Sequence, residues 1–244
     1  MSIDQLLTVE NWKNNSSAAM EQLLGRRKST AETELIRRIM QKTARYSAKT
    51  WKRSVVKYDA LDIHQEISSR GKPLRVLDVG CGDASVLSEL KKTYQEAIEC
   101  YGISVTEHPH LENVNYLICP AEIMPLELNE FFDIVFTHQA FHYMLNPNSA
   151  LGECVRVLKR GGLFGGYIGT EDAKKRLFYN PNLPSELNAE AQRISSSSRK
   201  RFNDNFLQVL RKLPAGFVAE VSYDKNSFPH KIYFMNVGDE KIIR

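Results

Sequence analysis

One stretch, residues 76–87, constrains the fold of this chain more than any other. It begins with an apolar run, passes through a turn that holds two glycines, and continues with apolar residues at helical spacing. Gly80 and Gly82 permit a tight turn and the close approach of a ligand, because neither residue carries a Cβ atom. The following helix would direct its positive dipole end at a carboxylate or phosphate. The stretch therefore predicts a nucleotide-like ligand at the carboxyl end of a parallel sheet.

The rest of the chain alternates predicted strands and helices, as expected of an open α/β sheet. The periodicity predicts one helix over 84–93 and another over 147–160, which Gly161 and Gly162 would end. Strand, crossover helix and strand of these lengths imply parallel pairing with a right-handed connection. The predicted strands are 74–79, 97–103, 114–119, 132–137, 163–168, 216–223 and 231–237.

Motifs along residues 74–170 resemble, in order, those of class I S-adenosylmethionine (SAM)-dependent methyltransferases of the small-molecule, methyltransferase-11-like type. In the first motif Ser85 stands where a dinucleotide fingerprint has its third glycine. The resemblance implies a Rossmann-like α/β fold with a seven-stranded, mostly parallel sheet and an antiparallel last strand. An ordinary Rossmann-like domain with another ligand is the alternative. The other matching motifs are 101–103, 120–125, 132–135 and 153–162.

The resemblance implies an enzyme that transfers a methyl group from SAM to an O or N atom of a small molecule and leaves S-adenosylhomocysteine (SAH). An alternative from another class is a degenerate SAM-fold module that binds a partner or ligand without turnover. A methyltransferase for RNA or protein is a variant, supported only by the basic segment 21–58 with eleven Lys or Arg and three Glu. A solvated helix face explains that segment equally well.

By the same resemblance, the first motif would hold the methionine end of SAM. The backbone of Gly80, Cys81 and Gly82 would approach the cofactor. Asp78 would hold either the glycine turn or the ammonium group of SAM, since a carboxylate at the end of a strand can meet a cation. A capping role in the turn is the alternative for Asp78.

Two recognition acids that the family commonly carries are absent. Ser104 stands where an acid would accept both ribose hydroxyls, and a serine offers no charged bidentate acceptor. Glu107 is the candidate substitute. Pro120 stands where an acid would accept the adenine amino group, so the Ala121 N–H and the Glu122 carboxylate are the remaining candidates for adenine contacts.

The segment after the fourth predicted strand is expected to contact both cofactor and substrate. Thr137 and His138 would face the cofactor, and His138, His142 and Tyr143 are the catalytic candidates. Either histidine has a pKa suited to a general base near neutral pH, and a packed structural histidine is the alternative. Gln139 stands where a metalloprotease helix has Glu, so no metal is predicted. Signatures for methylation of nucleic-acid bases are also absent, which disfavours a nucleic-acid partner.

The chain divides into an N-terminal helical cap or lid, residues 1–70, and a SAM-binding domain, residues 71–244. A polar stretch, 171–212, is predicted to be a substrate-side insertion. No apolar run approaches the ~20 residues of a membrane span, and no secretion signal is recognisable. The four cysteines show no close pairing, as in a cytoplasmic protein. The acceptor, its reacting atom, the pathway and the oligomeric state are not encoded in any pattern.

Overall fold

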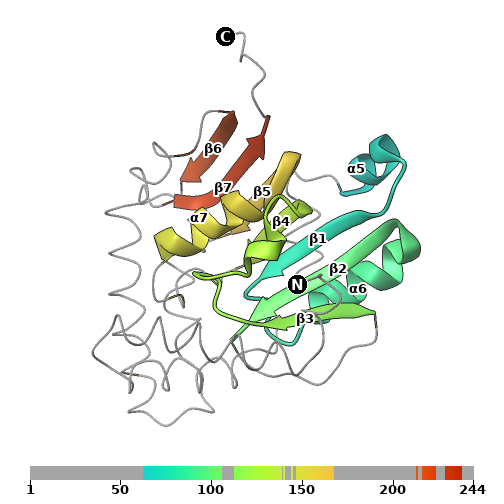
Figure 1. The fold of residues 1–244 in the computed structure, drawn as a ribbon, viewed down its shortest axis with the longest axis horizontal. Helices are drawn as coiled ribbons and strands as arrows, with labels where there is room; N and C mark the ends of the chain where they lie inside the picture. The colour runs from blue at the N-terminus through green and yellow to red at the C-terminus, as the bar shows by residue number, and fades with distance from the viewer. Residues whose placement is uncertain are drawn as a thin grey trace.

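One sheet organises the described part of the chain (Figure 1). The computed structural model describes residues 63–105, 113–138, 140, 144, 147–167, 189, 213, 216–223 and 229–237. The predicted cap therefore lies outside the described residues except for helix α5 (Ile63–Arg70), as do the basic segment 21–58 and, apart from Ala189, the predicted insertion 171–212. No helix among the described residues is long and apolar enough to span a membrane.

The described strands lie in the order β3-β2-β1-β4-β5-β7-β6. The first five strands in sequence pair in parallel, whereas β7 runs antiparallel to both β5 and β6. The predicted α/β class, mostly parallel sheet and antiparallel last strand are confirmed. The strands are β1 (Leu74–Val79), β2 (Ile98–Ser104), β3 (Val114–Ile118), β4 (Phe132–His138), β5 (Leu158–Tyr167), β6 (Phe217–Tyr223) and β7 (Pro229–Asn236).

Helices α6 (Ser85–Tyr94) and α7 (Pro147–Val157) cover opposite faces of the sheet. Successive residues of a strand point to opposite faces, so alternate residues of β1 meet different helices. Leu74 and Val76 face α6, while Leu77 and Val79 face α7. The central strands are buried on both faces and read as continuous apolar runs, as parallel strands do. Short 3₁₀ helices lie at η1 (Gln95–Ala97) and η2 (Leu126–Leu128).

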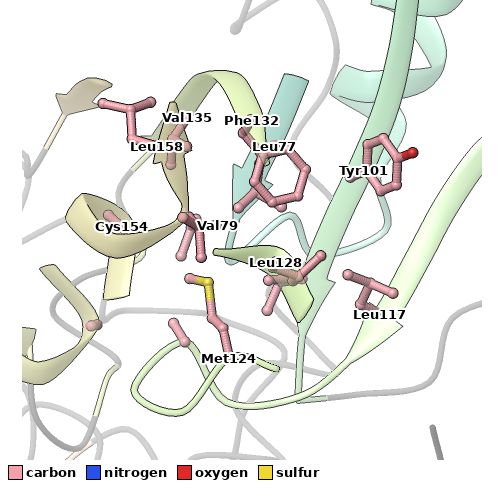
Figure 2. Close-up of a cluster of buried hydrophobic side chains, with 14 of the residues drawn as sticks. Leu77, Val79, Tyr101, Leu117, Met124, Leu128, Phe132, Val135, Cys154 and Leu158 are labelled. Atoms are coloured by element: carbon pink, nitrogen blue, oxygen red, sulfur yellow. The ribbon is translucent and has the colours of Figure 1, made fainter. Parts of the chain in front are cut away.

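The α7 face of the sheet is closed by the segment between β3 and β4. Met124 and Leu128 from this segment pack in one cluster with Leu77, Val79 and residues of α7. Figure 2 shows the Met124 side chain pointing toward Val79. The segment that follows β3 is therefore anchored in the core by its own apolar side chains.

The boundary between α7 and β5 corrects the sequence prediction. The helix ends at Val157 rather than at residue 160, and Gly161 and Gly162 lie inside β5 rather than after a helix. Phe132 pairs with Leu158 and Ile134 with Leu163, so a single β4 residue, Asp133, stands opposite four residues of β5. The bulge is possible because Gly161 adopts a φ of +70°, which an L side chain rarely does.

Asp133 is buried and fixes this bulge by its charge. Its carboxylate accepts the Arg75 backbone N–H at 3.0 Å and the Lys159 ammonium at 2.8 Å. Arg70 of α5 reaches the same carboxylate at 3.4 Å and donates to the Gly161 carbonyl. The sequence shows glycines where a helix would normally end, and it gives no sign of the buried acid that extends the strand.

The connection between β3 and β4 determines where a ligand would bind. The chain moves outward from β1 to β2 to β3, then returns to place β4 on the other side of β1. Loops that leave neighbouring strands in opposite directions open a crevice at the carboxyl ends of these strands. The switch point between β1 and β4 is thus the place where the sheet topology itself predicts a site.

Candidate functional site

The turn after β1 has an unusual backbone. Gly80, Gly82 and Ala84 all have positive φ angles, of 81°, 56° and 55°, so every second residue of the turn is left-handed. The N–H groups of Gly80 and Cys81 both donate to the Ile103 carbonyl of β2, at 2.9 and 3.0 Å. These bonds fold the turn onto the end of the neighbouring strand. The two glycines were predicted from the sequence, whereas the strained conformation of Ala84 was not.

The first turn of α6 is capped by the chain itself. The Asp83 carboxylate accepts the Ser85 N–H at 3.1 Å, and the Ala84 N–H donates to the Cys81 carbonyl at 2.9 Å. An acid at a helix N-terminus is favoured by the helix dipole. One of the first N–H groups of α6, that of Ser85, is thus already bonded to the Asp83 carboxylate.

Asp78 is the buried acid of this site. It is the next-to-last residue of β1 and is 4% exposed. Burial, assisted by the charge of Asp83, raises the pKa of its carboxyl to about 8. Within the described residues no Lys, Arg or His forms an ion pair with Asp78. A carboxyl in such surroundings is well suited to receive a cationic group from a ligand.

The candidates for ribose and adenine contacts lie at the ends of β2 and β3. Ser104 ends β2 and is buried, and its carbonyl accepts the Cys119 N–H at 3.0 Å. Ala121 and Glu122 follow Cys119 and are also buried. The fold therefore brings Ser104, Ala121 and Glu122 to one edge of the sheet. Glu107 lies outside the described residues.

At the end of β4, Thr137 and His138 adjoin the glycine turn. The Thr137 hydroxyl donates to the Val79 carbonyl at 2.8 Å, which ties β4 to β1 beside the turn. Burial lowers the pKa of His138 to about 4, so its imidazole is neutral at pH 7 and only weakly basic. His142 and Tyr143 lie outside the described residues, so their role stays a prediction.

Ala140 completes the contact between the two loops. A Cβ atom on Gly80 would lie 2.3 Å from the Ala140 Cβ, far inside any real contact. The glycine turn and the segment after β4 are therefore packed directly against one another. This contact gives Gly80 a second reason to be glycine, one that the sequence alone does not reveal.

The four cysteines are free thiols in the core. Burial raises the pKa of the Cys81 thiol well above its ordinary value, and the neighbouring Asp78 charge adds to this. Such a thiol is a poor nucleophile at neutral pH, so the Cys81 side chain is not a candidate nucleophile. Among the residues that the structure describes, no cluster of three His, Cys, Asp or Glu side chains is arranged to hold a metal ion.

A family model matches the part of the chain that contains the candidate site. The profile of the family described as "Methyltransferase domain" matches residues 77–165. This match runs from β1 to β5. All predicted site residues, from Asp78 to Tyr143, fall within it.

Curated relatives match the same part of the chain. A malonyl-[acyl-carrier protein] O-methyltransferase of Hahella chejuensis is 32% identical over 102 residues, which cover 39% of this chain and 37% of the relative. A ubiquinone biosynthesis O-methyltransferase of Pseudomonas fluorescens is 34% identical over 110 residues, or 41% of this chain and 45% of the relative. The chain thus spans less than half the length of the curated relatives it matches.

Solved structures share the fold at low sequence identity. The plantazolicin methyltransferase BpumL, in complex with a pentazolic desmethylPZN analog and SAH, aligns with a TM-score of 0.51 and 12% identity over 92% of both chains. The CMeT domain of a citrinin polyketide synthase aligns with a TM-score of 0.50 and 12% identity over 72% of this chain and 50% of that chain. At these identities the likeness concerns the fold alone.

Proposed function

We propose that this protein, whose residues 77–165 match the family described as "Methyltransferase domain", is a SAM-dependent methyltransferase that binds SAM at the β1–β4 switch point and methylates an O or N atom of a small molecule. The two relatives named above are O-methyltransferases, which supports an oxygen acceptor. The matched segment ends before the polar stretch 171–212, so an acceptor pocket built from that stretch and the cap would differ between relatives.

The observation that carries this proposal is the buried Asp78 carboxyl beside the glycine turn. A carboxyl whose pKa is raised to about 8 holds a proton at neutral pH and gains a partner when a cation arrives. SAM brings an ammonium group on its methionine end. The residues present therefore fit this cofactor at its charged end.

The remaining contacts follow from the sheet edge. The backbone of Gly80, Cys81 and Gly82 is assigned to the methionine end of SAM. Ser104 is assigned to the ribose by a single hydrogen bond, because it has no second oxygen. The Ala121 N–H and the Glu122 carboxylate are assigned to the adenine ring, and a neutral His138 with Thr137 borders the sulfonium side.

The sulfonium group of bound SAM supplies an activated methyl group, so the chain's own work is to bind, align and deprotonate the acceptor. His138, with its pKa lowered to about 4, is a weak base at neutral pH. His142 and Tyr143 are therefore the preferred candidates for handling the acceptor's proton. His142→Ala should lower turnover far more than affinity for SAM, and unchanged turnover would assign His142 to packing.

The test is calorimetric titration of the full chain with SAM and SAH. Binding in the micromolar range, and its loss in Gly82→Val, is the expected result, because a β-branched residue is strained at a φ of +56° and adds bulk to the turn. Folding is checked by circular dichroism in both proteins. No binding by the folded parent protein would refute the cofactor assignment. Equal binding by Gly82→Val would refute the role of the turn.

A second candidate function is a SAM-fold module that binds without turnover. Ser104 and Pro120 favour it, because both stand where methyltransferases commonly carry a recognition acid. Methyl transfer from SAM to any acceptor would exclude this candidate. The basic segment 21–58 is the feature that favours an RNA or protein acceptor. If the acceptor is RNA, the affinity of the protein for RNA should fall steeply between low and moderate salt.

A further inference from the structure

We propose that Tyr116 is a positioning residue for the glycine turn, acting through a hydrogen bond from its hydroxyl to the Gly82 carbonyl. The donor and acceptor oxygens are 3.0 Å apart, although Tyr116 lies on β3 and the turn follows β1. The inference rests on the proposed function, since the turn is the part of the site assigned to the methionine end of SAM.

The register of the sheet explains how a residue two strands away reaches the turn. Asp78 of β1 pairs with Gly102 of β2, and Gly102 pairs with Tyr116 of β3. Residues that pair across parallel strands point to the same face. Asp78, Gly102 and Tyr116 therefore form one row across the sheet, and Tyr116 packs with the cluster on the α6 face.

The middle position of this row has no side chain. A Cβ atom on Gly102 would lie 2.7 Å from the Cys81 sulfur and 3.0 Å from Leu87 of α6. The turn and the start of α6 therefore rest directly on the backbone of β2. Because Gly102 has no side chain, the Gly82 carbonyl comes within reach of a side chain from the next strand, β3.

The hydrogen bond has a consequence for the peptide between Gly82 and Asp83. In a trans peptide the C=O and the following N–H point in opposite directions, so fixing the Gly82 carbonyl also fixes the direction of the Asp83 N–H. Gly82 has a φ of +56°, and a glycine can leave this conformation more easily than a residue with a side chain. The Tyr116 hydroxyl holds this peptide from outside the turn, in addition to the Cys81 thiol, which contacts the same carbonyl oxygen at 3.9 Å from within the turn.

The same side chain also lies beside Cys81. Burial and the charge of Asp78 raise the pKa of the Cys81 thiol, and the interaction of this thiol with the Tyr116 side chain acts against them. Tyr116 thus interacts with both Cys81 and Gly82, two consecutive residues of the turn. Its aromatic ring is half-buried against the α6 cluster, so the hydroxyl is presented from a fixed position.

The experiment compares Tyr116→Phe with Tyr101→Phe in calorimetric titrations of the full chain with SAH. Both variants remove one hydroxyl, but that of Tyr101 contacts Glu99 at 3.2 Å on the opposite face of the sheet. We expect Tyr116→Phe to weaken SAH binding by about three- to tenfold, the loss of one neutral hydrogen bond. Tyr101→Phe should bind SAH as the parent protein does.

Thermal unfolding and hydrogen exchange of the unliganded variants separate positioning from stability. Faster exchange confined to peptides that contain residues 80–85 is expected only in Tyr116→Phe. If the parent protein binds SAH and Tyr116→Phe binds it equally well, the positioning role is wrong while the proposed function stands. If the folded parent protein binds neither SAM nor SAH, the proposed function fails and the role of Tyr116 toward SAM fails with it.

Gly102→Ala provides an independent test of the same arrangement. The added methyl group meets the Cys81 sulfur and should displace the turn, which weakens SAH binding by more than tenfold. Cys81→Ala removes that sulfur, so the double variant should recover part of the loss. If the losses of SAH affinity in Gly102→Ala and Cys81→Ala simply add up in the double variant, the turn does not depend on the absence of a side chain at Gly102.

Discussion

The backbone of Met124 is held on both sides by one ion pair of helix α7. The Glu153 carboxylate accepts the Met124 N–H at 2.7 Å, and Arg156 donates to the Met124 carbonyl at 3.0 Å. Arg156 also donates to the Pro125 carbonyl at 3.1 Å and is itself bound to Glu153 at 2.8 and 2.9 Å. A helix that follows β4 thus fixes the segment that follows β3, in which the candidate adenine contacts lie.

Glu153→Ala should loosen this segment. It removes the acceptor of a backbone N–H and leaves Arg156 without its acid, at an expected cost of about 1–3 kcal/mol. We also expect SAH affinity to fall several-fold, since Ala121 and Glu122 are only three and two residues from Met124. Calorimetric titration and thermal unfolding measure the two effects.

The matched control for Glu153→Ala is Glu99→Ala. Glu99 pairs with Arg75 at 3.1 Å, but both side chains are more than a third exposed, at 43% and 37%, so little stability is lost. A Glu153→Ala protein that is less stable yet binds SAH unchanged would limit the ion pair to a structural role.

Asp78→Asn should make the unliganded protein more stable while it weakens cofactor binding. The folded-state pKa of about 8 lies above the usual 3.8, so ionising this carboxyl opposes folding. Above pH 8 the neutral amide should raise the melting temperature by at least about 2–4 °C, equivalent to 1 kcal/mol in a chain of this size. A turn-capping role predicts the reverse, a lower melting temperature together with weaker binding.

Binding of SAH should strengthen as pH rises from 6 to 8. The ammonium group of the ligand favours the ionised carboxylate of Asp78, whose pKa of about 8 keeps it protonated at pH 6. The affinity should therefore rise by at most about tenfold per pH unit and level off above pH 8. Without ligand, this same group makes stability fall as pH rises from about 4 to 8.

Asp83→Asn is the control for this pH profile. Burial is the main cause of the raised pKa of Asp78 and the charge of Asp83 is the second, so the variant should shift the profile modestly to lower pH. An amide oxygen can still accept the Ser85 N–H. A flat profile in the parent protein would show that Asp78 does not meet the ammonium group.

The fold was predictable from the sequence where the chain repeats a simple pattern. The apolar runs before the glycine turn and at Phe132 predicted β1 and β4 to within one residue, because short apolar runs bounded by turn residues are typical of strands buried on both faces. The resemblance to methyltransferases is confirmed by the family match over residues 77–165. The predicted end of helix α7 was wrong, because the bulge opposite Asp133 depends on charged side chains from three different elements, α5, β4 and β5.

The site was predictable only in part, for a physical reason. Asp78 and the glycines occupy a local motif, and spacing along the chain identifies them. Tyr116 and Ala140 contact the turn from other strands, and these contacts follow from the register of the sheet and from the packing of Ala140 against Gly80. No local pattern carries that information. The catalytic assignment of His142 and Tyr143 stays a prediction.

Gly80→Ala and Gly152→Ala should change stability in opposite directions. At Gly80 the φ is +81° and the new Cβ would meet Ala140 at 2.3 Å, so both strain and a clash oppose the variant, at a cost of at least about 2 kcal/mol. Gly152 lies within α7 with nothing within 4 Å of its added Cβ, so alanine should stabilise the helix by about 0.5–1 kcal/mol. Urea unfolding measures both, and SAH binding should be lost only in Gly80→Ala. If Gly80→Ala were as stable as the parent protein, the turn and the segment after β4 would not be packed together as the contact between Gly80 and Ala140 requires.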